Sequence, residues 1–143
     1  MINESEALRR LVSICQGFQD AWRQHLSWSD DDGEYNHVGV LAEWIVDQVA
    51  AGETGCLPEL FAEVETILDG ASDAVHNLIV IGLLEDIQLY AIGKLTPKPK
   101  TLDPDVVLGL LGPRSKEAWF DLIAQYWDRF EPGRWRWQRR NPI

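Results

Sequence analysis

Residues 57–92 read LPELFAEVETILDGASDAVHNLIVIGLLEDIQLYAI, and they predict two helices joined by a short turn. Pro58 suits the first turn of a helix, where its missing N–H costs nothing. Gly70 suits the turn that ends this helix, and Ser72 can cap a second helix that runs to about Ile92. Because so few residues separate them, the two helices are expected to pack against each other as an antiparallel hairpin.

The two helices differ in how their apolar residues are spaced. The first has one apolar stripe at three- and four-residue steps, made of Leu60, Phe61, Val64, Ile67 and Leu68. The second is apolar around most of its circumference over residues 75–87, which is typical of a central helix covered by its neighbours. Its longest apolar run, residues 78–84, is too short to cross a bilayer.

Four further helices are expected on either side of this hairpin. They cover Asn3 to about Leu26, Val38 to about Ala51, Asp103 to about Leu111, and Ser115 to Phe130. Asn3 and Glu6 have the spacing of a capping box, and Gly52 suits the end of the helix before it. Residues 27–36 are expected to form an exposed acidic loop, and residues 94–101 a connector rich in Pro and Lys.

No stretch of useful length shows the alternation of a β-strand. The chain is therefore predicted to be a single all-α domain over residues 1–143, with about six helices packed as antiparallel hairpins, in a bundle or a HEAT-like array. Residues 131–143 form an Arg- and Trp-rich C-terminal tail.

Acidic residues are concentrated in one part of the chain. The formal net charge is −10 at pH 7, and residues 24–93 contain fourteen Asp and Glu but no Lys or Arg. Such a surface repels itself, so a block of one sign needs a reason. One reason is a strongly basic partner, whose approach the negative field would steer; the other is solubility alone. A direct nucleic-acid binder is expected to be basic overall, and this chain is the opposite.

The first helix of the hairpin carries two carboxylate pairs at four-residue spacing. Glu59 precedes Glu63, and Glu65 precedes Asp69. Like charges at this spacing disfavour a helix by about 0.2–0.5 kcal/mol per pair. The choice of acids is compatible with a surface kept acidic for binding, and also with drift, because the penalty is small.

The tail combines Arg134, Arg136, Arg139 and Arg140 with two Trp residues. Such a segment could stack on bases and neutralise phosphates. The preferred interpretation is that the rings of Trp135 and Trp137 fold back onto the domain while the Arg side chains pair with its acidic surface.

Cys15 and Cys56 are the only cysteines, and neither belongs to a CxxC pair. No signal peptide is recognised at the N-terminus. We therefore expect two reduced, buried thiols in a soluble cytoplasmic protein.

The sequence carries no recognisable metal or cofactor motif. His25, His37 and His76 lie in no HxxxH or HExxH pattern, and the three Asp residues at 30–32 lack the spacing of a calcium loop. There is no GxSxG, GxGxxG or Walker-type sequence either. We expect no cofactor, no metal and no catalytic residue.

Glu65 and Glu85 each lie beside the apolar stripe of their helix. Facing each other across the hairpin, they could share a proton and act as acid and base. More often such a Glu accepts hydrogen bonds from a helix end or a loop amide, and this structural role is the one we favour.

Two segments, FAEVETILDGASDAVHNLIVIGLLEDIQ at residues 61–88 and LGPRSKEAW at residues 111–119, resemble the DUF7674-like group of small acidic bacterial proteins. The resemblance covers about Val38 to Trp127. Its members resemble immunity proteins of polymorphic or contact-delivered toxin systems. The resemblance implies no catalytic residue, and Glu65, Asn77, Gly82 and Glu85 match as framework positions.

The leading hypothesis is an immunity protein, not an enzyme, that binds and neutralises a cognate toxin with a basic domain, such as a nuclease. The acidic surface would speed association, and aromatic anchors would slow dissociation. The chain would act in the cytoplasm as a monomer or weak homodimer, away from membranes. The predicted partner-binding residues are Trp28, Asp30, Asp31, Asp32, Glu34, Tyr35, Glu43, Trp44, Asp47, Glu59 and Glu63.

Two alternatives stay open. In the first, the spaced acids imitate phosphates, and the chain inhibits a DNA- or RNA-binding protein. In the second, it is an enzyme that uses Glu65 and Glu85.

Overall fold

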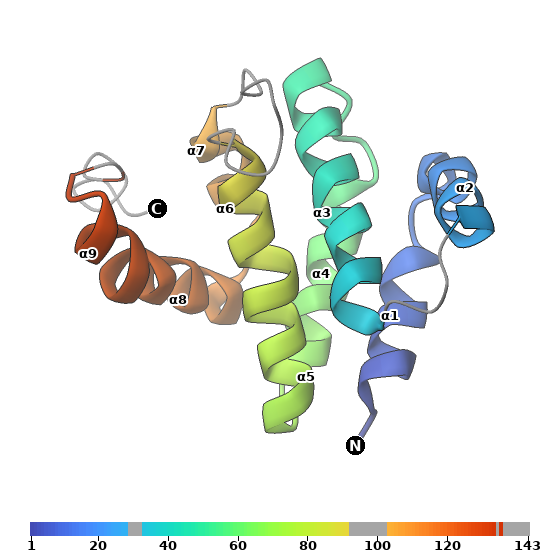
Figure 1. Ribbon diagram of the computed structural model, residues 1–143, viewed down its shortest axis with the longest axis horizontal. Helices are drawn as coiled ribbons and strands as arrows, with labels where there is room; N and C mark the ends of the chain where they lie inside the picture. Colours follow the sequence, from blue (N-terminus) through green and yellow to red (C-terminus); the bar gives the residue numbers. More distant parts are fainter. Residues whose placement is uncertain (29–32, 92–102, 134, 136–143) are drawn as a thin grey trace.

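The computed structural model describes residues 1–28, 33–91, 103–133 and 135, and in them it contains helices and no strand (Figure 1). The prediction of an all-α fold is confirmed. The helical elements are α1 (Glu4–Val12), η1 (Gln16–Phe18), α2 (Gln19–Trp28), α3 (Glu34–Ala51), α4 (Leu57–Leu68), α5 (Asp73–Asn77), η2 (Leu78–Glu85), α6 (Asp86–Ala91), α7 (Pro104–Leu110), α8 (Pro113–Leu122), η3 (Ile123–Trp127) and α9 (Asp128–Phe130).

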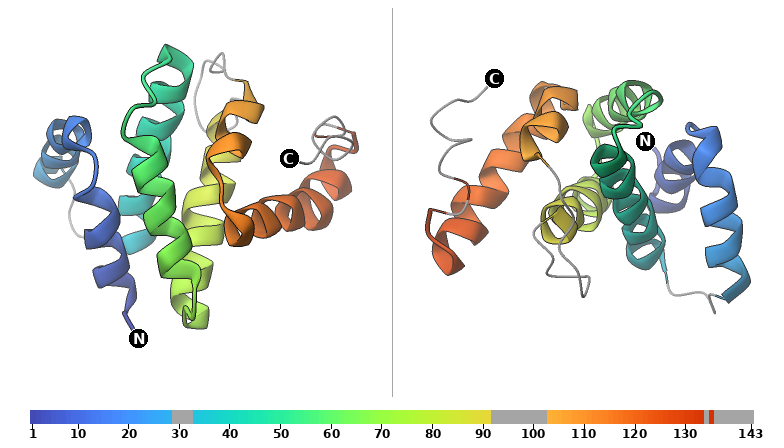
Figure 2. Two further views of the ribbon diagram at one scale, coloured as in Figure 1. Left: turned by 180° about the vertical axis from the view of Figure 1, so that it is seen from behind. Right: turned by 90° about the horizontal axis from the view of Figure 1, so that it is seen from above.

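The centre of the molecule is the continuous helix formed by α5, η2 and α6, whose middle part is π-helical. α3 packs along one side of it, and α8 packs against η2 and then runs away toward α9 (Figure 1). α4 lies behind α3 in that view and comes to the front when the molecule is seen from behind (Figure 2). α1 packs on α3 and α4, and α2 lies beside α3 at the edge.

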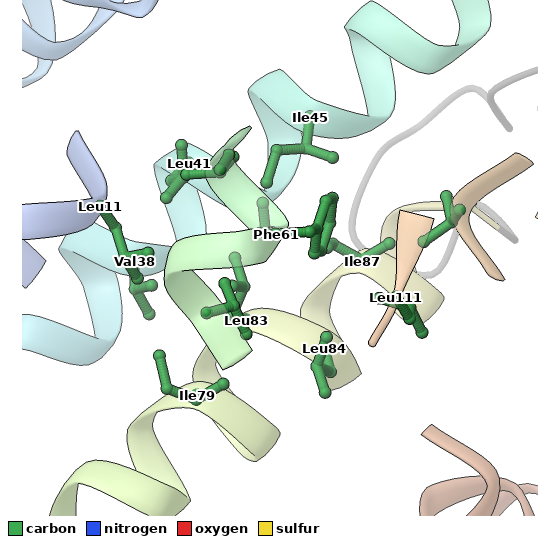
Figure 3. Packing of buried hydrophobic residues seen from close by; sticks show 14 of the residues in the cluster. Leu11, Val38, Leu41, Ile45, Phe61, Ile79, Leu83, Leu84, Ile87 and Leu111 are labelled. Carbon is green, nitrogen blue, oxygen red and sulfur yellow. The ribbon is translucent and has the colours of Figure 1, made fainter. Parts of the chain in front are cut away.

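Fully buried side chains from α3, α4 and η2 meet between these helices (Figure 3). Leu41, Phe61 and Leu83 represent the three elements, and all three are 0% exposed. Burial of such side chains is the main favourable term in folding, at about 1.5–3 kcal/mol each. The prediction that the second helix of the hairpin is central is confirmed.

The central helix, Asp73–Ala91, is long and apolar enough by composition to cross a membrane. The sequence prediction considered only the apolar run at residues 78–84, whereas the whole helix meets this criterion. In the structure the helix is covered by α3 and α8, and a core helix covered by its neighbours has the same apolar composition.

The local signals in the hairpin act as predicted. Pro58 lies in the first turn of α4, and Gly70 has a φ of 76°, a left-handed conformation that glycine adopts without strain. The Ser72 hydroxyl accepts a hydrogen bond from the Val75 amide at 3.3 Å and caps α5. Gly52, also with a positive φ of 75°, ends α3.

The side chain of Gln88 links the central helix to α8 and η3 by hydrogen bonds. Gln88 of α6 is 0% exposed; its Oε1 accepts a hydrogen bond from Trp127 Nε1 at 2.7 Å, and its Nε2 donates to the Trp119 carbonyl at 3.4 Å. Both the donor and the acceptor of the Gln88 side chain are therefore satisfied in the core. The helix predicted over residues 115–130 is present and begins two residues earlier, at Pro113.

The prediction of one helix from Asn3 to about Leu26 is wrong. α1 ends at Val12, and α2 begins at Gln19 after the short turn η1. The Gln19 side chain donates a hydrogen bond to the Val12 carbonyl at 2.6 Å, which satisfies one of the carbonyls that the end of α1 leaves open. Of the predicted capping box, Asn3 accepts from the Glu6 amide at 2.9 Å, while the Glu6 carboxylate pairs with Arg10 instead.

The prediction of two reduced thiols is also wrong. Cys15 and Cys56 form a disulfide with a Cα–Cα distance of 5.7 Å. It joins the break between α1 and η1 to the start of α4. The two residues are 41 positions apart in the chain, and their spacing in the sequence did not predict that they would form a bond.

The expected acidic loop at residues 27–36 is shorter than predicted. Ser27 and Trp28 belong to the end of α2, and Glu34, Tyr35 and Asn36 form the first turn of α3. Asp30, Asp31 and Asp32 lie outside the described residues, as does the connector at 94–101.

Part of the tail does fold back onto the domain. Trp135 is 4% exposed, with its ring centroid 5.9 Å from that of Trp119 and 6.2 Å from that of Trp127. This confirms the preferred interpretation for Trp135. Trp137 and the four Arg residues of the tail lie outside the described residues.

Candidate functional site

Three carboxylates from α3 and α6 gather around the Tyr90 hydroxyl. Glu43 and Asp47 lie one turn apart on α3, beside its buried stripe, and Asp86 begins α6. All four side chains are half-buried. The two helices approach closely here because residue 39 is a glycine: a Cβ at Gly39 would lie 3.1 Å from Asp86 Oδ2. We call Glu43, Asp47, Asp86 and Tyr90 the α3–α6 acidic cluster.

The electrostatic field of this cluster is negative. Burial and the neighbouring Glu85 carboxylate raise the pKa of Asp86 to about 6. Burial, together with Glu43, Asp86 and Asp47, raises the pKa of the Tyr90 hydroxyl to about 12. Ionisation of Asp86 and of Tyr90 is therefore disfavoured by the carboxylates beside them.

Within the described residues, no Lys or Arg forms an ion pair with Glu43, Glu85 or Asp86. The helices that carry the cluster contain no Lys or Arg, because residues 24–93 contain neither residue type. A positive group brought by a partner would therefore meet carboxylates that the described part of the chain leaves uncompensated.

The acids of α4 are in a different situation. Glu63 lies 3.9 Å from an Arg10 nitrogen of α1, and Asp69 lies 2.9 Å from Arg114 of α8. Glu59 is exposed on the same helix. Of the predicted acids, Glu43 and Asp47 thus lie in the α3–α6 acidic cluster, and Glu59 and Glu63 lie on α4, which is behind α3 in Figure 1.

The predicted aromatic anchors differ in exposure. Trp28, at the end of α2, is 76% exposed, and Tyr35 in the first turn of α3 is 43% exposed. Trp44 is half-buried, with its ring centroid 5.4 Å from that of Phe18, so part of the ring belongs to the packing between α3 and η1. Trp28 and Tyr35 offer the larger accessible surfaces.

Glu34 is held by the N-terminal helix. The Ser5 hydroxyl donates a hydrogen bond to Glu34 Oε1 at 2.8 Å. That bond, together with one from the Glu34 amide and the nearby charge of His37, outweighs burial and lowers the pKa of Glu34. Glu34 therefore stays charged at neutral pH and ties α3 to α1.

Glu65 has the structural role that we favoured. Its Oε1 accepts from the Arg114 amide at 2.9 Å, and its Oε2 accepts from the Ser115 amide at 2.8 Å and the Ser115 hydroxyl at 2.6 Å. Burial on its own would raise the pKa of Glu65, but the hydrogen bonds from Ser115 and Arg114 lower it. A Cβ at Gly112 would lie 2.3 Å from Glu65 Cγ, so only glycine fits there.

This arrangement removes support for an acid–base pair. Both oxygens of Glu65 are committed to the first turn of α8, where the helix dipole also favours a negative charge. Glu85, at the end of η2, lines the groove between η2 and α8. Burial raises the pKa of Glu85, and Glu65 is not among the groups that shift it.

The structure brings together two histidines that sequence spacing kept apart. His25 of α2 and His37 of α3 lie with Nε2 and Nδ1 2.8 Å apart, and both rings pack on Trp22. The pair joins the ends of α2 and α3 on both sides of residues 29–32. The sequence signal that could have indicated this pair is the position of His25 and His37 on either side of one short acidic segment. The described residues hold no group of three or more side chains suited to a metal ion.

Comparison with known proteins identifies the family. The model of a family described as "Domain of unknown function (DUF7674)" matches residues 8–128. No curated protein and no solved structure matches the chain. The matched region runs from α1 through η3 and includes the acidic cluster and the Glu65 cap. The chain therefore belongs to the DUF7674 family.

Proposed function

We propose that this chain is an immunity protein that binds a basic toxin domain through the α3–α6 acidic cluster. The observation that carries the proposal is that the half-buried carboxylates of Glu43, Glu85 and Asp86 form no ion pair with a described Lys or Arg, on helices that contain neither residue type. Solubility alone does not require half-buried acids, because exposed ones serve that purpose at less cost.

The cluster would act through charge. Its negative field would steer a basic domain into contact, and Lys or Arg side chains of the partner would relieve the repulsion between Asp86 and Glu85. Trp28 at the end of α2 and Tyr35 in the first turn of α3, both exposed, would supply the apolar part of the contact. Bound in this way, the chain would cover the toxin's active site or the path of its substrate.

The test begins with the gene next to the one for this chain, which the proposal predicts to encode a toxin. Co-expression should rescue growth, and the two proteins should purify as a complex whose affinity falls with salt. Rescue that fails for the neighbouring toxin, together with no measurable complex, would overturn the proposal.

Two matched charge reversals then locate the contact. Glu43→Lys with Asp47→Lys alters α3, and Glu59→Lys with Glu63→Lys alters α4 by the same amount. We expect the α3 pair to weaken binding by at least about tenfold and to reduce the salt dependence, and the α4 pair to do so less. Equal effects of the two pairs would show that the α3–α6 acidic cluster has no special role.

The compartment is part of the proposal. We expected reduced thiols together with a cytoplasmic location, and the Cys15–Cys56 disulfide contradicts the first of these two expectations. Trapping the thiols with an alkylating agent at lysis, followed by mass spectrometry, measures the state of the pair where the protein works. A cytoplasmic site of action predicts that the toxin acts there too.

A further inference from the structure

A groove of about 600 Å³ lies between η2 and the helix formed by α8 and η3. It is lined from the η2 side by His76, Val80, Ile81 and Glu85, which recur at four- and five-residue steps. The π-helical course of η2 has more than four residues per turn, so this spacing keeps the four side chains on one face. In an α-helix the pairs four residues apart would still share a face, but the pairs five residues apart would not.

The opposite wall is one face of α8 and η3. Glu117, Asp121 and Gln125 follow each other at four-residue steps, and Tyr126 completes the wall from the π-helical η3. Both walls of the groove therefore contain π-helical turns, an arrangement that is frequent at functional sites and uncommon elsewhere.

The groove exposes apolar surface in an otherwise buried layer. Ile81 is 46% exposed and Tyr126 is 37% exposed, although both belong to helices whose other large apolar residues are mostly buried. The Phe130 ring, with its centroid 5.0 Å from that of Tyr126 and 64% exposed, extends this surface beyond the groove. Exposed large apolar groups that adjoin one another mark contact sites more often than isolated ones do.

The rim is predominantly negative. Glu85, Glu117 and Asp121 line it, against one Arg, Arg114, which is already paired with Asp69 at 2.9 Å. None of the three acids forms an ion pair with a described Lys or Arg. Burial raises the pKa of Glu85, which a positive group in the groove would reverse.

We propose that this groove binds a basic amphipathic helix of the partner protein, with apolar side chains against Ile81 and Tyr126 and Lys or Arg against Glu85, Glu117 and Asp121. Helix-in-groove binding uses this combination of an apolar floor and charged edges. The inference rests on the proposed function for the identity of the partner. Glu85 faces the groove, and the next residue, Asp86, belongs to the α3–α6 acidic cluster, so one partner could span both.

The probe is a synthetic helical peptide of about 14 residues with Leu on one face and Lys on the other. Binding to the full chain is measured by the anisotropy of a dye on the peptide, and the contacted residues are mapped by amide chemical shifts. A peptide with Glu in place of Lys reports the charge requirement, and one with Ser in place of Leu reports the apolar requirement. We expect only the Leu/Lys peptide to bind, with shifts concentrated in η2, α8 and η3.

Two variants and two matched controls test the site. Ile81→Ser and Asp121→Lys change the groove, whereas Val106→Ser and Glu53→Lys make the same changes at exposed positions that do not line it. We expect each groove variant to weaken peptide binding by about tenfold and each control by less than about twofold. Equal effects of groove and control variants, or shifts spread evenly over the acidic surface, would overturn the proposal.

The remaining outcomes separate this proposal from the proposed function. If toxin neutralisation is retained in both groove variants, the groove assignment fails and the immunity function stands. If the peptide binds in the groove but the neighbouring toxin is not neutralised, the immunity function fails and the groove stands. A free chain that sediments as a dimer, and becomes a monomer with Ile81→Ser, would assign the groove to a second copy and overturn the proposal.

Discussion

The Cys15–Cys56 disulfide makes the clearest quantitative prediction for this fold. It connects residues 41 positions apart, and in the chain-entropy model a loop of this length restricts the unfolded chain by about 4 kcal/mol at 25 °C. Small domains are stable by only about 5–15 kcal/mol. Loss of the bond should therefore remove a large part of the stability of the domain, because the break between α1 and η1 is otherwise held by the Gln19 side chain and by packing.

The assay is urea unfolding followed by the fluorescence of the buried Trp residues, with and without a phosphine reductant. Reduction should lower the midpoint by about 2 M urea, given a slope of about 2 kcal/mol per M. Cys15→Ala, Cys56→Ala and the double variant should each lower it by a similar amount, because removing either sulfur removes the bond.

The double variant is also the control for the reductant, which should not change its stability. Thiol titration of the unfolded wild-type protein under non-reducing conditions should find no free thiol. Two free thiols in freshly purified protein, or equal midpoints for the oxidised and reduced chains, would refute the reasoning.

Three further predictions follow from single side chains. Glu65→Gln should lower stability by about 2–3 kcal/mol at pH 7 by calorimetry, because it weakens charge-assisted bonds to the start of α8. The pKa of Glu65 is lowered on folding, so its contribution to stability is present above the unfolded pKa of 4.5 and is lost as the pH falls through the folded pKa. The loss of stability below pH 4.5 should therefore be shallower in Glu65→Gln than in the wild-type protein. The same pH dependence of stability in both proteins would contradict this. Asp86→Asn should increase stability at pH 7 by about 1 kcal/mol, after allowance for solvent screening, because the pKa of Asp86 is raised on folding and its charged form is disfavoured. That gain in stability should vanish as the pH falls from above 6 toward 4, which urea titrations at several pH values would measure. A loss of stability of Asp86→Asn at pH 7 would contradict the prediction. Trp135→Ala should cost about 3–5 kcal/mol because the ring is buried between Trp119 and Trp127, and an unchanged melting temperature would mean that the tail does not pack on the domain.

The candidate site was predictable only in part. The sequence located Glu43 and Asp47 in an acidic block, but Asp86 lies on a helix that is apolar on most sides and was not among the predicted partner-binding residues. Tyr90 and the close approach at Gly39 were missed, since both depend on how α3 lies against α6. Glu59 and Glu63 were predicted to share the partner-binding surface with Glu43, yet they lie on α4, where Glu63 is 3.9 Å from an Arg10 nitrogen of α1.

The sequence by itself determined most helices of this protein, although not the break between α1 and α2, because the signals that start and end a helix are local. Ser72, Pro58 and Gly52 each act within one turn of their own position, and the apolar pattern of residues 75–87 is enough to make that helix central. The tertiary structure alone decided the contacts between distant residues: the Cys15–Cys56 bond, the His25–His37 pair, and the carboxylate of Glu65 on an amide 50 positions away. Such contacts depend on how packed helices align in space, which the spacing of residues along the chain does not encode.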